Sequence, residues 1–195
     1  IAGTEEPDQG QVIRQNGAKI AYLTQLHEFQ EEETVLSCVV SGSVSVKGSW
    51  GGTDAGDADI MEHEARSMLN TLGILEHDAK MSTLSGGQKK RAALARTLLL
   101  PSDILILDEP TNGLDIEATV EMREVILRLA KEKGVTFLVA SHLAAEIEKM
   151  CDKVLVLYEG EMLSFDTKEE ALRLNPSLED YFLAKVRDKK GSVVL

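Results

Sequence analysis

The stretch that decides the fold is Ile104-Leu105-Ile106-Leu107-Asp108-Glu109-Pro110. An unbroken apolar run that ends in charged residues is typical of a strand buried in a parallel sheet. Open sheets of this kind bind ligands outside the carboxyl ends of their strands. The stretch therefore predicts an α/β fold in which Asp108 and Glu109 lie at the ligand-binding edge of the sheet.

Two neighbouring carboxylates at such an edge have a specific chemical use. One can position Mg²⁺, directly or through water, while the other accepts a proton from an attacking water. Taken alone, Asp108 and Glu109 are equally consistent with two acidic loop residues after a core strand. Their role therefore depends on the rest of the chain.

Strands and helices alternate on both sides of this stretch. Upstream, the pattern predicts a strand over residues 18–23, a glycine- and serine-rich loop over 41–56, and helices over 58–72 and 86–100. Downstream, it predicts a helix over 116–133 ended by Gly134, a buried strand over 135–140, a helix over 143–150, a hairpin over 153–165, and helices over 166–174 and 177–186. This order predicts a mainly parallel sheet flanked by helices, with a small helical subdomain inserted at about residues 28–100.

The helix over 86–100 opens with Ser85, Gly86, Gly87 and Gln88. Adjacent glycines let a ligand approach the backbone, and the first N–H groups of a helix point outward unsatisfied. This end favours a phosphate, with the Ser85 hydroxyl as an added donor. A serine N-cap followed by a glycine turn is the more common explanation of such a stretch.

Two more polar side chains follow predicted strands. His142 comes after the strand that ends at residue 140, and its imidazole could reach a γ-phosphate, although a lone histidine is more often structural. Gln25 comes after the strand over 18–23, where an amide could meet a metal or a water, whereas a solvent-facing glutamine is the simpler alternative.

The order of these groups along the chain resembles the ABC (ATP-binding cassette) ATPase family. Gln25 corresponds to the Q-loop glutamine of that family, and residues 84–88 correspond to its signature motif. Asp108 and Glu109 correspond to the end of the Walker B strand and its catalytic glutamate. Asp115 corresponds to the D-loop aspartate, and His142 corresponds to the switch histidine. The resemblance runs over almost the whole chain. It implies a P-loop NTPase-like fold with ATP and Mg²⁺ as cofactors.

The resemblance also implies a role for each residue. Asp108 and Gln25 would serve Mg²⁺, while Glu109 and His142 would be the catalytic groups, with Glu109 polarising the attacking water. The cofactor-binding residues Ser85, Gly86, Gly87 and Gln88 would contact the nucleotide of a second ABC ATPase domain in a head-to-tail dimer. Asp115 would communicate across that interface.

A phosphate-binding loop of the form G-x-x-x-x-G-K-S/T does not occur in the sequence. Residues 1–12 resemble the stretch that follows this loop in the family, so we expect residues 1–195 to be one N-terminally truncated ABC ATPase domain. Without the loop there is little to hold the β- and γ-phosphates, so the family resemblance implies an ATPase while turnover by the chain alone is an open question. Apolar sheet surface around residues 104–107 and 137–140 is expected to be uncovered.

Composition narrows the partners and the location. A net charge of −12 over 195 residues gives no general attraction to nucleic acid or anionic lipid. No run approaches the roughly 18 consecutive apolar residues of a membrane span, so a link to the membrane would come through a permease partner, without direct insertion. The basic cluster Lys89-Lys90-Arg91 is interpreted as a solvated face. Cys38 and Cys151 are interpreted as thiols in a reducing compartment, and the expected location is the cytoplasm, at the inner face of the plasma membrane.

Three hypotheses for function remain. The leading one is a cassette domain that binds and hydrolyses ATP to power a membrane transporter, because residues 113–115 and 141–148 resemble the ATP-binding subunits of ABC exporters. The second is an ABC-F-type, ribosome-associated ATPase, because residues 22–25 and 82–91 resemble that group. The third is a truncated or engineered chimeric fragment, joined near residue 110, without independent ATPase activity.

Overall fold

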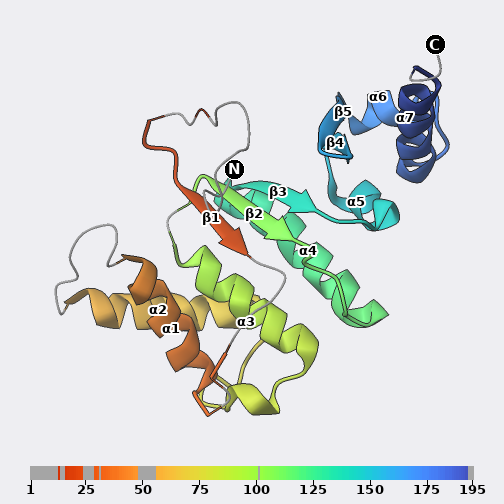
Figure 1. Ribbon diagram of the computed structural model, residues 1–195. Coiled ribbons are helices and arrows are strands. Elements are labelled where there is room, and N and C mark those ends of the chain that lie inside the picture. The colour runs from red at the N-terminus through yellow and green to blue at the C-terminus, as the bar shows by residue number, and fades with distance from the viewer. Residues whose placement is uncertain are drawn as a thin grey trace. The chain divides into compact units, whose positions relative to one another are not determined.

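The computed structural model describes residue 13 and residues 16–23, 29–30, 32–47, 56–100 and 102–192. It divides into two compact units, Ile1–Ala140 and Ser141–Leu195, and Figure 1 labels the elements of both. The prediction of a single domain with a helical subdomain over about residues 28–100 stays a prediction.

The first unit is built around a parallel sheet. Among the described residues its strands are β1 (Ile20–Leu23), β2 (Ile104–Asp108) and β3 (Thr136–Ala140), and their order in space is β1-β2-β3. β2 lies in the middle, with Leu23 opposite Leu107 on one side and Ala140 opposite Asp108 on the other. The predicted strands and their parallel pairing are confirmed.

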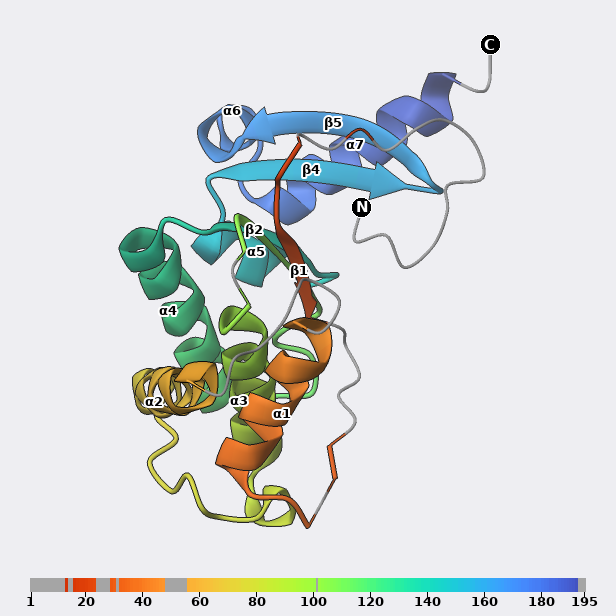
Figure 2. The same ribbon diagram turned by 90° about the vertical axis from the view of Figure 1, so that its left-hand side faces the viewer.

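Helices connect these strands. Between β1 and β2 the chain forms α1 (Val35–Lys47), α2 (Gly56–Thr71), the short 3₁₀ helix η1 (Met81–Thr83) and α3 (Gly86–Leu98), and α4 (Ile116–Lys133) joins β2 to β3. The helices α1, α2 and α3 pack on one another in both ribbon views (Figures 1 and 2). α3 also contacts β1 and α4, so the helical cluster is joined to the sheet through α3.

The core of the first unit lies between the sheet and the helices. Leu105 and Leu107 of β2 are fully buried there, together with Leu94 of α3 and Leu129 of α4. β2 is therefore the buried strand that the sequence predicts, and the expectation of uncovered surface around residues 104–107 is wrong. α3 and α4 contribute to the core that covers this face.

β3 differs from its prediction. Its residues alternate between exposed and half-buried, and Leu138 is 40% exposed, so the prediction of a buried strand is wrong and that of uncovered surface around residues 137–140 is confirmed. The physical reason is the alternation of side chains along a strand: Phe137 and Val139 pack on the core, whereas Leu138 lies on the opposite face of the sheet.

α1 is the element that the sequence does not predict. Residues 41–47 belong to this helix, whereas a loop was expected from residue 41 onward; residues 48–55 lie outside the described part. Serine, valine and glycine have low helix propensity, which favours a loop on local grounds. The helix forms because Val35, Cys38 and Val39 are buried against the neighbouring helices, and tertiary packing outweighs local propensity.

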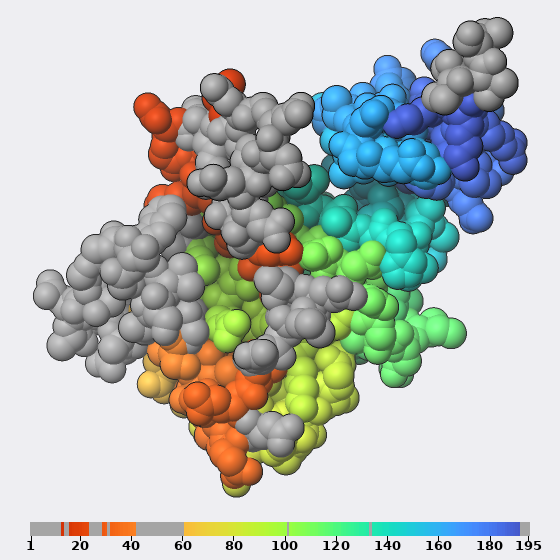
Figure 3. Space-filling view, viewed as in Figure 1, coloured from red at the N-terminus to blue at the C-terminus, as the bar shows by residue number. Residues whose placement is uncertain are grey.

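The start of α1 is tied to the segment that leads into α3. The N–H of Val35 donates to the carbonyl of Ala79 (2.9 Å), and the N–H of Met81 donates to the carbonyl of Glu33 (2.9 Å). In the space-filling view the orange surface of α1 meets the yellow-green surface of this segment (Figure 3). These bonds hold η1 in place, and η1 leads directly to Ser85 at the beginning of α3.

The second unit contains α5 (Ala144–Met150), a hairpin of β4 (Lys153–Tyr158) and β5 (Glu161–Thr167), α6 (Lys168–Leu172) and α7 (Leu178–Ser192). Glu159 (φ 49°) and Gly160 (φ 77°) make the turn, and a positive φ at both residues is what a two-residue hairpin loop of this type requires. The predicted hairpin and helices are confirmed, and Figure 2 shows β4 and β5 side by side. Val156, Ala171, Leu178 and Tyr181 form the core of this unit.

α3 and α4 approach each other closely near their first turns. A Cβ atom added to Gly87 would lie 3.0 Å from the Cβ of Ala118, whereas one added to Gly86 would meet no atom within 4 Å. Glycine at position 87 therefore allows α3 and α4 to approach closely, and a larger residue there would require Ala118 to shift. α4 ends as predicted, at Gly134 in the left-handed conformation (φ 64°).

Truncation of Leu105 tests the position of the core. Leu105→Ala is expected to lower the free energy of unfolding by about 2–5 kcal/mol, because the side chain is fully buried and its removal leaves a cavity. Leu138→Ala, on the neighbouring strand, is the matched control and is expected to cost less than about 1 kcal/mol. Urea denaturation of the chain measures both, and equal costs would contradict this assignment of the core.

A double-mutant cycle tests the approach of α3 to α4. Gly87→Ala is expected to lower the free energy of unfolding by about 1 kcal/mol, although alanine is the better helix former, because its methyl group meets Ala118. Gly86→Ala has open space and is expected to cause no loss. Adding Ala118→Gly to Gly87→Ala should recover part of the loss, and strict additivity of the two changes would show that the helices do not touch there.

Candidate functional site

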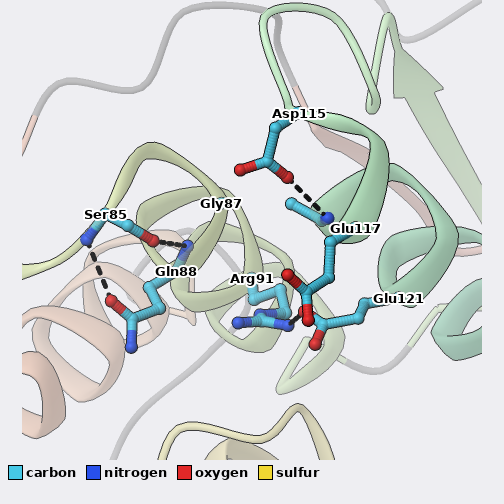
Figure 4. A pocket seen from close by; sticks show the side chains of 8 residues that line it. Ser85, Gly87, Gln88, Arg91, Asp115, Glu117 and Glu121 are labelled. Carbon is cyan, nitrogen blue, oxygen red and sulfur yellow. Dashed lines mark hydrogen bonds and ion pairs between the residues drawn. The ribbon is translucent and has the colours of Figure 1, made fainter.

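The first turns of α3 and α4 open into one pocket of about 260 Å³. It is lined by Ser85, Gly87, Gln88, Arg91, Asp115, Glu117, Ala118 and Glu121, and Figure 4 shows these side chains around it. The structure thus brings the predicted cofactor-binding residues Ser85, Gly87 and Gln88 together with Asp115. Gly86 belongs to the same helix end but is not a lining residue.

The first turn of α3 is capped by its own side chains. The N–H of Gln88 donates to Ser85 Oγ (3.2 Å), and the N–H of Ser85 donates to Gln88 Oε1 (2.9 Å), which forms a capping box. The serine N-cap, the more common explanation of this sequence, is therefore confirmed. It is compatible with anion binding, because the end of a helix carries partial positive charge and there is open space beside Gly86.

The first turn of α4 is capped by Asp115. One of its carboxylate oxygens accepts a hydrogen bond from the N–H of Ala118 (2.8 Å), and Glu117 follows within the first turn. Carboxylates at this end are stabilised by the helix dipole. The pocket thus has the N-terminus of α3 on one side and acidic side chains on the other.

Arg91 lies between these two sides. Its guanidinium forms an ion pair with Glu121 of α4, and its side chain is only 14% exposed. The Nε atom is buried and has no hydrogen-bond partner in the described part of the chain. The interpretation of Lys89-Lys90-Arg91 as a solvated face is therefore wrong at Arg91, because the spacing of one helical turn from Gly87 places it at the contact with α4.

Asp108 lies at the end of β2 and is held by a residue from β1. The hydroxyl of Tyr22 donates to Asp108 Oδ2 (3.0 Å). Tyr22 is paired with Ile106 across the sheet, and Ile106 and Asp108 are two residues apart on one strand, so the three side chains share a face. Sequence reasoning assigned no separate role to Tyr22, although its alternation with Ala21 and Leu23 could have placed it on that face.

Glu109 leaves the strand in a left-handed conformation. Its φ of 47° is unusual for a residue with a side chain, and such a conformation costs roughly 1–2 kcal/mol. Its N–H donates to the carbonyl of Ala140 (2.9 Å), and its own carbonyl accepts from the N–H of Asn112 (3.1 Å). The backbone therefore turns immediately after the strand, between the two predicted carboxylates.

Lys90 reaches this turn from α3. Its ammonium donates to the carbonyl of Glu109 (3.4 Å) and to the carbonyl of Asn112. Burial lowers the pKa of the Lys90 ammonium from its usual range, and the negative charge of Glu109 opposes that shift. The prediction of a solvated face is wrong here too, because the long side chain extends to carbonyl groups that are distant in sequence.

The other two predicted residues are not tested. Gln25 lies outside the described residues. His142 belongs to the second unit whereas Glu109 belongs to the first, so their predicted common site stays a prediction.

The described residues suit a metal ion that takes most of its ligands from water and substrate phosphates, and few from protein side chains. They contain no group of three or more histidine, cysteine, aspartate or glutamate side chains that could hold an ion by themselves. Mg²⁺ keeps several waters and commonly binds through one or two carboxylates together with substrate phosphates. The single carboxylate of Asp108, at the end of β2 and held by Tyr22, fits that mode. None of the described helices is long and apolar enough to cross a membrane.

Comparison with known proteins gives consistent matches. The spermidine/putrescine import ATP-binding protein PotA of Mesoplasma florum is 31% identical over 172 residues, which cover 87% of this chain and 49% of that protein. The bacitracin transport ATP-binding protein BcrA of Bacillus licheniformis is 38% identical over 137 residues, or 68% of this chain and 44% of that protein. The chain thus spans about half the length of these relatives.

Solved structures show the same fold. An inward-facing metal-chelate-type ABC transporter aligns with a TM-score of 0.74 at 22% identity, over 87% of this chain and 66% of that one. The ADP conformation of an ATP-binding cassette of an ABC transporter aligns with a TM-score of 0.63 at 22% identity, over 84% and 68%. These alignments confirm the predicted P-loop NTPase-like α/β fold.

A family model described as ABC transporter matches residues 1–112, which include the signature residues and the carboxylates after β2. Together with the relatives, this match shows that the chain belongs to the ABC transporter family and is part of its ATP-binding domain.

Proposed function

We propose that this chain supplies one part of an ATP-hydrolysing site in a cassette that powers a membrane transporter. The observation that carries the proposal is the pocket that joins Ser85, Gly87 and Gln88 with Asp115, next to the turn that bears Glu109. The names of the relatives PotA and BcrA, both ATP-binding proteins of import or transport, support the transport role.

The carboxylates after β2 take different roles in this proposal. Mg²⁺, when bound with ATP, neutralises phosphate charge and orients the phosphates. In this proposal Asp108, whose carboxylate accepts a hydrogen bond from the Tyr22 hydroxyl, would hold the ion, and Gln25 would be a second ligand. Glu109 accepts a proton from the attacking water, and His142 contacts the γ-phosphate.

The signature end of α3, defined as Ser85, Gly86, Gly87 and Gln88, faces a different nucleotide. We propose that it binds the phosphates of an ATP molecule held by a second ABC ATPase domain in a head-to-tail dimer. Acidic groups nearby oppose anion binding, but the Asp115 carboxylate caps α4 and Glu121 is paired with Arg91. The partial positive charge at the end of α3 is thus the part of the pocket that suits phosphate.

The wider assembly follows from the same proposal. A membrane permease is the partner that transport requires, and the cytoplasmic face of the membrane is the location. The ribosome-associated alternative rests on the resemblance of residues 22–25 and 82–91 alone, whereas the names of the relatives reported above describe import or transport. The chimeric-fragment hypothesis predicts no ATP turnover by this chain, and the next experiment separates it from the proposal.

Replacement of Glu109 tests the proposed chemistry. Glu109→Gln keeps the shape of the side chain but removes the base, so the rate of ATP hydrolysis with Mg²⁺ is expected to fall about 100-fold or more. Phosphate release by the purified chain measures the rate, and Glu132→Gln on the exposed end of α4 is the matched control. Absence of turnover in the unchanged chain would support the fragment hypothesis, and undiminished turnover in Glu109→Gln would exclude Glu109 as the base.

Replacement of Ser85 tests the proposed dimer. Ser85→Ala is expected to weaken association with a complete ABC ATPase domain in the presence of MgATP, and to cost about 1 kcal/mol of stability from the lost cap. Thr167→Ala is the matched control, because it removes the same type of capping box from α6. Sedimentation with MgATP measures association, and an equal loss in both variants would mean that Ser85 acts only as a cap.

A further inference from the structure

Lys90 connects two parts of the candidate site that are far apart in sequence. It lies in α3, in the helical turn that follows the signature end. Its ammonium donates to the carbonyls of Glu109 and Asn112, which follow β2 in the chain. The next residue, Arg91, forms an ion pair with Glu121 of α4. Consecutive side chains of α3 therefore hold the beginning and the end of the segment over residues 109–121.

The segment that Lys90 contacts is a turn with an unusual backbone. Glu109 (φ 47°) and Gly113 (φ 72°) are both left-handed, and only glycine adopts that conformation without strain. Within the turn, the N–H of Asn112 donates to the carbonyl of Glu109 (3.1 Å), and the N–H of Leu114 donates to the carbonyl of Thr111 (3.2 Å). The conformation of Glu109 must be supported by its surroundings to persist.

The contacts of Lys90 are suited to give that support. An ammonium group has three donors and can bind two carbonyl oxygens at once. Lys90 is half-buried, and burial of a charged group is unfavourable unless it is hydrogen-bonded, so the two carbonyls and the ammonium stabilise one another. Loss of the ammonium would leave both carbonyls without this donor and the left-handed Glu109 without this support.

We propose that Lys90 is a positioning residue that holds the turn over residues 109–113, and with it the side chain of Glu109, in a fixed place relative to the signature end of α3. The inference rests on the proposed function, because the group that it positions is the proposed base. The ammonium of Lys90 bonds to backbone carbonyls of the turn, so Lys90 would act through Glu109. Its role is to make the turn and the first turns of α3 a single rigid piece.

Amide hydrogen exchange of the full chain tests whether Lys90 holds the turn. Lys90→Met is expected to speed exchange at the N–H groups of Asn112 and Leu114 about tenfold, because the turn that contains both N–H groups loses the hydrogen bonds from the ammonium to the carbonyls of Glu109 and Asn112. Lys90→Arg keeps charged donors and is expected to restore slow exchange. Lys89→Met, which removes the same charge from the preceding position of α3, is the matched control and should leave exchange unchanged.

The exchange rates can be measured without ATP, so they test the role of Lys90 in the turn independently of ATP turnover. Unchanged exchange in Lys90→Met, or equally fast exchange in Lys89→Met, would overturn it. Thermal unfolding checks that each variant is folded, and Lys90→Gln takes the place of Lys90→Met if the latter does not fold.

ATP hydrolysis then tests whether the held turn places the base. Lys90→Met is expected to lower kcat about tenfold with KM for MgATP unchanged, and Lys90→Arg is expected to recover kcat. Faster exchange with an unchanged kcat would overturn the positioning of Glu109. Absence of turnover in the unchanged chain would count against the proposed function instead, while the exchange experiment would still decide whether Lys90 holds the turn.

Discussion

Because β2 is hydrogen-bonded to a parallel strand on each side, its carboxyl end has a fixed position and direction, and the described part of the site in the first unit is placed relative to that end. Asp108 is still in register with Ala140 of β3, whereas Glu109 is already in a left-handed turn. Neighbouring carboxylates thus have different surroundings. One is oriented across the sheet by Tyr22, and the backbone of the other is held by β3 and α3.

The second constraint is the distance between α3 and α4. Because Gly87 has no side chain, its backbone can lie close to the methyl group of Ala118. The close approach of the two helices brings both of their N-termini into one pocket. Two helix ends would favour negative charge in the same place. α4 satisfies this preference with its own carboxylates, while α3 is capped by neutral side chains and keeps its first turn suited to an external anion.

Much of the fold could be predicted because the relevant signals are local. The apolar run before Asp108, the helical pattern of α4 and the stop at Gly134 each depend on a few adjacent residues, and the structure confirms them. α1 could not be predicted, because its residues favour a loop by propensity and form a helix only when Val35 and Val39 are buried by other elements. The exposure of alternate residues of β3 likewise depends on which face of the strand packs on the core, which hydrophobicity alone does not reveal.

The sequence by itself determined the family, the α/β fold and the identities of the polar residues at Ser85, Asp108, Glu109 and Asp115, because motif spacing and hydrophobic period are properties of the linear chain. Only the tertiary structure decided which of them share a pocket, and it added Tyr22, Lys90 and Arg91 to the surroundings of the site. Their contacts join residues separated by 86, 19 and 30 positions along the chain. Contacts of that kind follow from strand pairing and helix packing, which place distant side chains together irrespective of their separation in sequence.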